Sequence, residues 1–158
     1  MDNNEYEKFL SQLELPFLET NQIYLHQIFE TLEQEFSLRK NSQKVFVDLG
    51  AGNGQVVIFS ALNYGIKSVG IEIDPNQIKE ANRTIKSLKR GMISKKRNLR
   101  KIKIVHRDFY TLSLKNCDFI YIYSLPTMQK YLKHVFKTAK NSAIIISHSI
   151  PSKVLTYV

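Results

Sequence analysis

Hydrophobic and polar residues recur along this chain with two different periods. Near the N-terminus, apolar residues return every three or four positions, which predicts amphipathic helices over 5–15 and 21–36. From position 44 onward, short apolar runs alternate with further helical patterns. The runs predict five strands, at 44–48, 68–72, 102–106, 118–123 and 143–147. Because the runs are apolar throughout, we expect the strands to be buried on both faces of a sheet.

The segments between these strands carry helix signals. A helix is expected over 55–64. A second one starts at Asp74 and Pro75, which supply a cap and a first-turn proline, and ends near Gly91. A basic loop follows, and Pro126 opens a helix before the last strand. This order predicts a Rossmann-like, doubly wound α/β domain whose mostly parallel sheet has the strand order 3-2-1-4-5.

The length and composition place this fold in one folding unit. The chain has 158 residues, about the size of one domain. We divide it into an N-terminal helical cap, 1–36, and a sheet-containing domain, 37–158. A polar, acidic N-terminus and the lack of a long apolar run predict a cytoplasmic protein without a membrane span. With one cysteine, no metal site is expected.

Charge is distributed unevenly. The formal net charge is +9, yet residues 1–36 hold eight acidic residues and a single basic one. The run 79–103 carries eleven basic residues and one acid. This asymmetry suits an acidic or polyanionic partner such as RNA. A solvated, lysine-rich surface is an equal alternative, because the run lacks the aromatic residues on which bases stack.

Three glycines, Gly50, Gly52 and Gly54, follow the first strand within five residues. Between a strand and a helix, glycines let the backbone approach a ligand closely. Glu72 ends the next strand, and the carboxyl ends of neighbouring parallel strands lie side by side. A carboxylate at that position can accept hydrogen bonds from both hydroxyls of a ribose. The combination predicts a nucleoside-binding site.

The spacing of this motif distinguishes between nucleoside cofactors. The dinucleotide fingerprint requires a third glycine where this chain has Gln55. An acid, Asp48, stands two positions before the first glycine, where it would repel a pyrophosphate. It suits a ligand with a cationic amino-acid end, such as S-adenosyl-L-methionine. A glycine-rich turn without a ligand is the alternative.

With these residues the sequence resembles the class I (seven-β-strand) S-adenosylmethionine-dependent methyltransferases, over roughly 16–151. Its compact length and three short motifs are similar to small archaeal protein-lysine methyltransferases and the ATP synthase c-subunit lysine methyltransferase group. The motifs are Pro-Phe-Leu-Glu-Thr at 16–20, Tyr-Ser-Leu-Pro at 123–126 and Ser-His-Ser at 147–149. The family sheet usually ends in an antiparallel hairpin of strands six and seven, which is expected to be missing here.

The resemblance implies a set of cofactor-binding residues. One of them precedes the first strand, and the others lie at the ends of the first three strands. The members of the set are Thr20, Asp48, Gly50, Ala51, Gly52, Gly54, Glu72, Ile73, Asp108 and Phe109. Asp48 and the glycine-rich loop would hold the methionine part. Glu72 would hold the ribose, and Asp108 with Phe109 would hold the adenine.

The resemblance also implies that the acceptor meets the methyl group where Tyr123, Ser124 and Pro126 line a channel. Enzymes that methylate adenine N6 typically place Asn or Asp before Pro-Pro there, and Ser124 offers neither a carboxylate nor an amide. A lysine amine needs only deprotonation, so protein-lysine N-methylation is our hypothesis. The alternatives are an RNA or small-molecule methyltransferase, or a non-catalytic cofactor-binding domain. We expect His148, at a strand end, to be a polar residue with satisfied hydrogen bonds.

Overall fold

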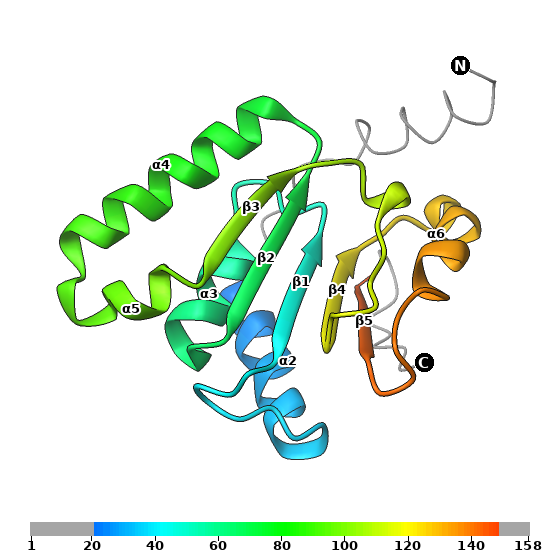
Figure 1. Ribbon diagram of the computed structural model, residues 1–158, viewed down its shortest axis with the longest axis horizontal. Helices are drawn as coiled ribbons and strands as arrows, with labels where there is room; N and C mark the ends of the chain where they lie inside the picture. The colour runs from blue at the N-terminus through cyan, green and yellow to red at the C-terminus, as the bar shows by residue number, and fades with distance from the viewer. Residues whose placement is uncertain (1–20, 149–158) are drawn as a thin grey trace.

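The computed structural model describes residues 21–148 (Figure 1). The predicted helix over 5–15, residue Thr20 and the segment on which the expected loss of a hairpin depends lie outside the described residues. In the described part of the chain, no helix is both long and apolar enough to cross a membrane.

Five parallel strands form one sheet in the order β3-β2-β1-β4-β5. They are β1 (Val45–Leu49), β2 (Lys67–Glu72), β3 (Ile102–His106), β4 (Phe119–Tyr123) and β5 (Ile144–His148). The predicted fold class and strand order are therefore confirmed, and each strand lies within one residue of its expected bounds. The order reverses on the two sides of β1, and ligands of such sheets bind at the carboxyl ends of the strands next to that point.

Four helices of eight residues or more connect or flank these strands in the described region. They are α2 (Gln22–Glu35), α3 (Gln55–Tyr64), α4 (Pro75–Gly91) and α6 (Gln129–Phe136). The predicted cap of α4 is present, because the Asp74 side chain accepts a hydrogen bond from the Asn76 N–H at 2.8 Å. Short helical turns fill the remaining connections, as η1 (Ile93–Lys95), α5 (Lys96–Leu99), η2 (Phe109–Thr111) and η3 (Pro126–Met128).

The segment after Gly91 differs from the predicted loop, since it folds into η1 and α5. Its one apolar anchor, Leu99, is fully buried. The Asn98 side chain donates a hydrogen bond to the Leu62 carbonyl at 3.3 Å, and the Lys101 ammonium donates to the Gly65 carbonyl. These contacts dock the segment on the C-terminal end of α3. A four-residue helix is too short to show a hydrophobic period, so sequence analysis missed it.

The two faces of the sheet are buried in separate hydrophobic clusters. Phe46 of β1, Tyr121 of β4 and Ile146 of β5 belong to the cluster formed with α2 and α3. Val47 and Ile120 belong to the other, which α6 and the segment after β3 complete. Figure 1 shows α2 and α3 on one side of the sheet and α6 toward the other. Burial on both faces explains why the strand sequences lack alternation.

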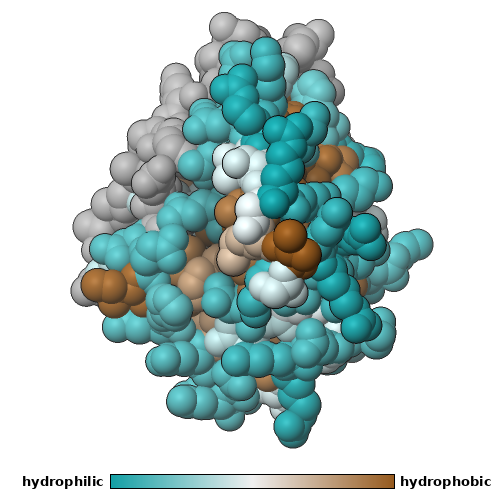
Figure 2. All heavy atoms as spheres, turned by 90° about the vertical axis from the view of Figure 1, so that its left-hand side faces the viewer, coloured by the Kyte–Doolittle hydropathy of each residue, from teal (hydrophilic) through white to brown (hydrophobic). Residues whose placement is uncertain are grey.

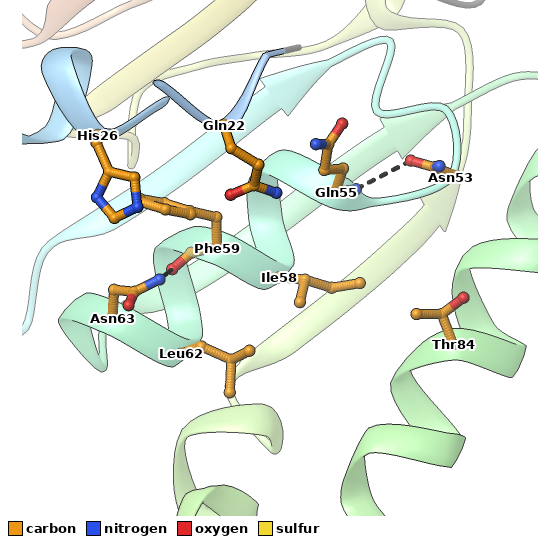
Figure 3. Close-up of a pocket in the computed structure, with 9 residues that line it drawn as sticks. All are labelled: Gln22, His26, Asn53, Gln55, Ile58, Phe59, Leu62, Asn63 and Thr84. Atoms are coloured by element: carbon orange, nitrogen blue, oxygen red, sulfur yellow. Dashed lines mark hydrogen bonds between the residues drawn. The ribbon is translucent and has the colours of Figure 1, made fainter. Parts of the chain in front are cut away.

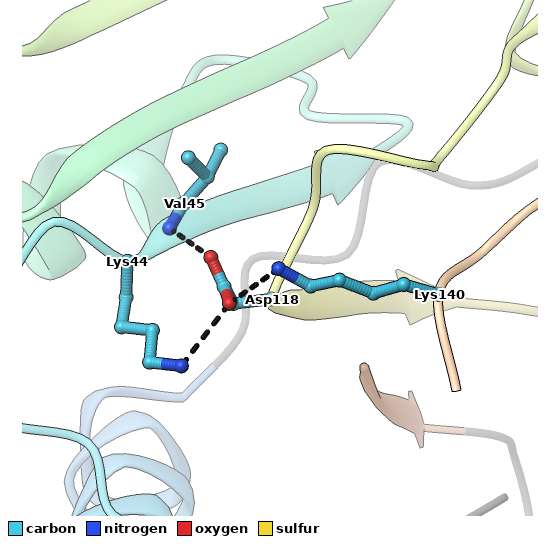
Figure 4. A network of polar contacts seen from close by, with 4 residues as sticks. All are labelled: Lys44, Val45, Asp118 and Lys140. Carbon is cyan, nitrogen blue, oxygen red and sulfur yellow. Dashed lines mark hydrogen bonds and ion pairs between the residues drawn. The ribbon is translucent and has the colours of Figure 1, made fainter. Parts of the chain in front are cut away.

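At the amino edge of the sheet, Asp118 joins three segments (Figure 4). Its carboxylate accepts hydrogen bonds from the Val45 N–H at 2.8 Å and the Lys140 ammonium at 2.7 Å, and Lys44 lies at 3.3 Å. Burial acts to raise its pKa, but the hydrogen bonds from Lys140, Val45 and Lys44 together lower the pKa of Asp118. The ionised carboxylate thus fixes the start of β1 to the start of β4.

At the other edge, Gly70 of β2 allows the loop after β1 to lie directly on the sheet. A Cβ atom on Gly70 would stand 2.7 Å from the Ala51 Cβ and 2.9 Å from the Ile104 Cδ1. The Ala51 Cβ can move only with the backbone of the loop, and Ala51 is buried, whereas the end of the Ile104 side chain can rotate away. A glycine inside a strand often marks such a close backbone approach.

Replacing Gly70 with alanine should therefore lower the free energy of unfolding by about 2 kcal/mol, because the added methyl overpacks the interior. Gly91 supplies the matched control, since a Cβ there would meet nothing within 4 Å. Gly91→Ala, at a helix end, should be neutral or stabilising by up to about 1 kcal/mol. Urea denaturation of both variants measures the difference, and equal effects would contradict this account of Gly70.

Candidate active site

The polar residues predicted to form a site gather at the carboxyl edge of the sheet. Asp48 pairs with Tyr121 in the register of β1 and β4, and Tyr123 pairs with His148 in the register of β4 and β5. Paired residues, and residues two apart on one strand, share a face of a sheet. Asp48, Tyr123 and His148 therefore lie on the same face as Phe46 and Tyr121, which is the face that α2 and α3 cover.

The loop after β1 turns back over the end of β2. The N–H groups of Gly50 and Ala51 both donate to the Ile71 carbonyl, at 2.8 and 2.9 Å. Gly50, Gly52 and Gly54 have φ angles of 86°, 52° and 81°, a left-handed conformation that side chains disfavour. The glycine spacing thus follows from the path of the loop, which brings backbone N–H groups to the carboxyl edge.

Glu72 holds this loop in place. One carboxylate oxygen accepts from the Gly52 N–H at 2.7 Å, and the other accepts from Ile73 and Asp74 at 2.8 and 2.9 Å. A carboxylate offers about four acceptor positions, so these bonds leave about one for a ligand. To accept both hydroxyls of a ribose, Glu72 has to share or release one of its backbone partners.

Asp48 is a buried carboxyl with an exposed fraction of 3%. No described residue donates a hydrogen bond to it. Burial, and then the nearby charge of Glu72, raise the pKa of Asp48 to about 8. Two acidic side chains thus face the same space without a cation beside Asp48, and a positively charged ligand group would stabilise them.

The residues expected around the adenine lie at the end of β3. Ile73 is half-buried, and its carbonyl is 3.0 Å from the His106 Nε2. Asp108 is half-buried and caps η2, because it accepts a hydrogen bond from the Tyr110 N–H at 2.8 Å. Phe109 is buried in the hydrophobic core, with one ring atom 3.7 Å from the Cβ position of Gly50. Phe109 is therefore a core residue whose edge supports the glycine-rich loop.

The residues expected around the acceptor lie at the ends of β4 and β5. Tyr123 is half-buried, and burial raises the pKa of its hydroxyl. Ser124 is buried, its N–H donates to the His148 carbonyl at 2.9 Å, and its hydroxyl is 3.3 Å from that of Ser147. Pro126 begins η3, and its side chain lies outside the described parts of the structure, as does Thr20.

His148 is not the satisfied polar residue that its sequence position suggested. Its Nδ1 atom is buried without a hydrogen-bond partner among the described residues. Its ring packs edge-on against Tyr123, with centroids 5.0 Å apart, and lies 5.7 Å from the ring of Tyr24 in α2. Burial lowers the pKa of His148. The His148 ring thus contacts two tyrosines while its Nδ1 atom has no partner in the described part of the chain, an arrangement that its spacing in the sequence could not reveal.

A separate groove of about 430 Å³ lies over α3, between α2 and α4 (Figure 3). Four of its nine lining residues carry amide side chains, among them Gln22, Asn53 and Asn63. Asn53 belongs to the glycine-rich loop, where its side chain accepts a hydrogen bond from the Gln55 N–H at 3.2 Å. None of the described residues expected to bind the cofactor lines this groove, so it is distinct from the carboxyl-edge site.

Comparison with protein families and solved structures identifies this arrangement. The family model of the ANTKMT methyltransferase domain matches residues 48–156. The chain therefore belongs to the ANTKMT methyltransferase domain family. No curated protein matches it significantly.

Solved structures show the same fold. An RNA methyltransferase from Salinibacter ruber, in complex with S-adenosyl-L-homocysteine, has a TM-score of 0.65 at 21% identity, over 82% of this chain and 76% of that chain. A SAM-dependent methyltransferase from Geobacter sulfurreducens, also with S-adenosyl-L-homocysteine, has a TM-score of 0.63 at 14% identity over 89% of this chain. This chain spans 54% of the length of the Geobacter protein. Together with the family, these matches make the chain an S-adenosylmethionine-dependent methyltransferase, as its sequence indicated.

The carboxyl edge fits this cofactor on physical grounds. S-adenosylmethionine carries an ammonium and a sulfonium group, and the site offers a buried carboxyl at Asp48, near the acidic Glu72, to which no described residue donates a hydrogen bond. The loop after β1 also carries Gly50, Gly52 and Gly54, which have no side chain to keep a ligand away from the backbone. Cationic groups match the first feature, and close backbone approach to a ligand matches the second.

The burial of Asp48 predicts how the stability of the protein depends on pH. Its pKa is raised in the folded protein from 3.8 to about 8, so the folded state binds more protons than the unfolded state between these values. Its contribution to stability is thus full below about pH 4 and is lost as the pH rises toward 8. Asp48→Asn cannot ionise and therefore does not lose this stability as the pH rises. The difference in melting temperature, variant minus wild type, should increase by several degrees from pH 5 to pH 8.

Asp118→Asn is the matched control for this experiment. Because the pKa of Asp118 is lowered, its contribution to stability is present above pH 4 and disappears only in acid. The deficit of Asp118→Asn should therefore stay constant from pH 5 to pH 8. Thermal unfolding of the three proteins without cofactor tests both statements. Parallel curves for Asp48→Asn and the wild type would contradict the raised pKa of Asp48.

Proposed function

We propose that this methyltransferase transfers a methyl group from S-adenosylmethionine to the amine of a protein lysine. The observation that carries the proposal is the environment at the ends of β4 and β5. There, the ring of His148, whose pKa is lowered by burial, contacts Tyr24 and Tyr123, and its buried Nδ1 atom has no hydrogen-bond partner among the described residues. Tyrosine faces attract an ammonium group, and an unprotonated imidazole can accept its proton.

On the donor side, we assign the methionine part of the cofactor to Asp48 and to the backbone of Gly50, Ala51, Gly52 and Gly54. Ionised Asp48 would pair with the cofactor's ammonium group. Glu72 would accept from the ribose, at the cost of sharing one of its backbone bonds. Ile73 and Asp108 would flank the adenine, while Phe109 acts from the core by supporting Gly50. Thr20 stays a proposed member of this set on the basis of the resemblance alone.

On the acceptor side, bound S-adenosylmethionine supplies an already activated methyl group, so the protein's task is to position and deprotonate the nucleophile. Tyr123 lies on the same face of the sheet as Asp48. It follows Tyr121, the residue that pairs with Asp48 in the neighbouring strand, by two positions. We assign it to the wall of the acceptor channel, with Ser124 and Pro126 following it. His148 Nδ1 would take the proton from the incoming ammonium. The half-buried surroundings of Tyr123 and His148 favour the neutral amine by desolvation.

An RNA acceptor is the second candidate, because the Salinibacter ruber structure is named an RNA methyltransferase and this chain carries a strongly basic run. The arrangement of that run supports lysine over RNA. Its basic residues cluster around the C-terminal end of α4 and α5, which pack toward the amino edge of the sheet (Figure 1). An RNA held there would lie at the opposite edge from Tyr123 and His148.

The proposed role of Asp48 predicts pH-dependent cofactor binding. Below pH 8 Asp48 has to release a proton before it can pair with the ammonium group, so affinity should fall up to about tenfold for each pH unit below 8. Calorimetry with S-adenosylmethionine between pH 6 and 8.5 measures this dependence. Asp48→Asn should bind weakly at every pH, and a pH-independent affinity in the wild type would contradict the assignment.

The lysine acceptor itself is tested with S-adenosylmethionine labelled in its methyl group and an extract of cells that lack the enzyme. We expect labelled protein that protease digests and nuclease leaves intact, with methyl-lysine after acid hydrolysis. Label that survives protease and disappears with nuclease would support the RNA alternative. His148→Gln should slow protein labelling about 100-fold, the usual loss for a general base, without changing cofactor affinity. His26→Gln, at an exposed histidine of α2, is its control.

A further inference from the structure

An apolar pair lies exposed at the turn between α4 and η1. In the described part of the chain, the exposed large hydrophobic residues are Ile23, Met92 and Ile93. Two of these three are thus consecutive, and Ile93 has an exposed fraction of 81%. Single exposed apolar residues are ordinary. An adjacent pair at the projecting end of a helix is unusual enough to need a physical explanation.

Cations surround this pair. The last turn of α4, η1, α5 and the residue that follows them contribute six basic residues, which together with Met92 and Ile93 we call the basic corner. They are Lys89, Arg90, Lys95, Lys96, Arg97 and Arg100. No acidic residue occurs between Glu80 and Asp108, and none of the six takes part in the ion pairs of the described residues. Their charge is therefore uncompensated within the described structure.

The basic corner lies far from the site of methyl transfer. α4 begins at Pro75, just after the carboxyl end of β2, and its 17 residues run away from that edge. A helix of this length spans about 25 Å. Figure 2 views the side of the molecule that carries α4 and α5, and it shows isolated hydrophobic residues within a largely hydrophilic surface. The corner is thus a surface of its own, with no described contact to Asp48 or Tyr123.

We propose that the basic corner docks this protein on an anionic lipid surface, with Met92 and Ile93 entering the interface between headgroups and acyl chains. Clusters of four to eight basic residues bind anionic headgroups. An aliphatic side chain within such a cluster strengthens binding further, because it buries apolar surface in the membrane interface. A binding site for single-stranded RNA would instead present aromatic rings to the bases, and 79–103 contains none.

This orientation has a consequence for the enzyme. With the basic corner on the lipid surface, the carboxyl edge of the sheet is held on the order of 25 Å above it, the length of α4. The site then faces the water-exposed part of a membrane-bound protein, and the cofactor enters from solvent. Docking does not depend on the identity of the acceptor, so its test is independent of the lysine proposal.

The test measures binding of the full chain, without cofactor or acceptor, to sedimented vesicles of phosphatidylcholine with or without phosphatidylserine. We expect binding only to vesicles that contain phosphatidylserine, and weaker binding when the salt concentration is raised well above about 0.1 M. Ile93→Gln should weaken binding about tenfold through lost apolar burial. The control is Ile23→Gln, which changes an equally apolar residue that is 66% exposed on α2 and should have no effect.

Charge is tested by a matched pair of double variants. Lys96→Gln with Arg97→Gln should weaken binding about 30-fold, since each basic residue near an anionic surface contributes a factor of about five. Lys133→Gln with Lys137→Gln removes the same net charge from the exposed side of α6 and should leave binding nearly unchanged. Circular dichroism melts verify that every variant folds.

Three results would overturn the proposal. Equal binding to both kinds of vesicle would remove the role of charge, and equal losses in the two double variants would mean that net charge, rather than the corner, attracts the lipid. Binding to a single-stranded RNA oligonucleotide in place of vesicles, undiminished by Ile93→Gln, would assign the corner to nucleic acid. None of these results depends on whether lysine is the methyl acceptor.

Discussion

Two acidic side chains at the carboxyl ends of β1 and β2, held close together with little water, set the main constraint on this structure. Glu72 is tied to the loop and to the start of α4 by three backbone hydrogen bonds. Asp48 is buried and accepts no such bond from the part of the chain that the structure describes. Keeping an unpaired carboxyl in this position costs stability whenever it ionises. The fold tolerates this cost, which is understandable if a cationic ligand completes the site.

The rest of the site follows from the register of the sheet. Because β1, β4 and β5 are parallel and in register, the alternation of side chains that puts Asp48 on one face also puts Tyr123 and His148 there. The residues that we assign to the donor and acceptor regions are thus brought together by hydrogen bonding between strands. Gly70 then lets the loop lie flat enough on β2 for its backbone to face the same edge.

The sequence predicted the architecture well because five apolar runs and their turn residues repeat the same physical signal. It also predicted that Asp48, Glu72 and the glycines lie at the same edge of the sheet, because they follow or end neighbouring parallel strands. Their contacts with the cofactor stay a prediction. The sequence did not predict that Glu72 would be nearly saturated by backbone N–H groups, because burial and hydrogen bonding are properties of the folded chain. The ring of His148 contacts Tyr24, more than one hundred residues away in the sequence, and no local pattern encodes that contact. Phe109 likewise proved to be a core residue, which its aromatic character left undecided.

Tyr24 lies before the first residue that the family model matches, whereas the loop, Glu72 and the ends of β3 to β5 lie within the match. The family match therefore contains the proposed donor half of the site, and one wall of the proposed acceptor half comes from α2, outside the match. On this assignment, substitutions in α2 would reshape that wall without changing the carboxylates or the glycines. Acceptor choice and cofactor use would then be encoded by different parts of the chain.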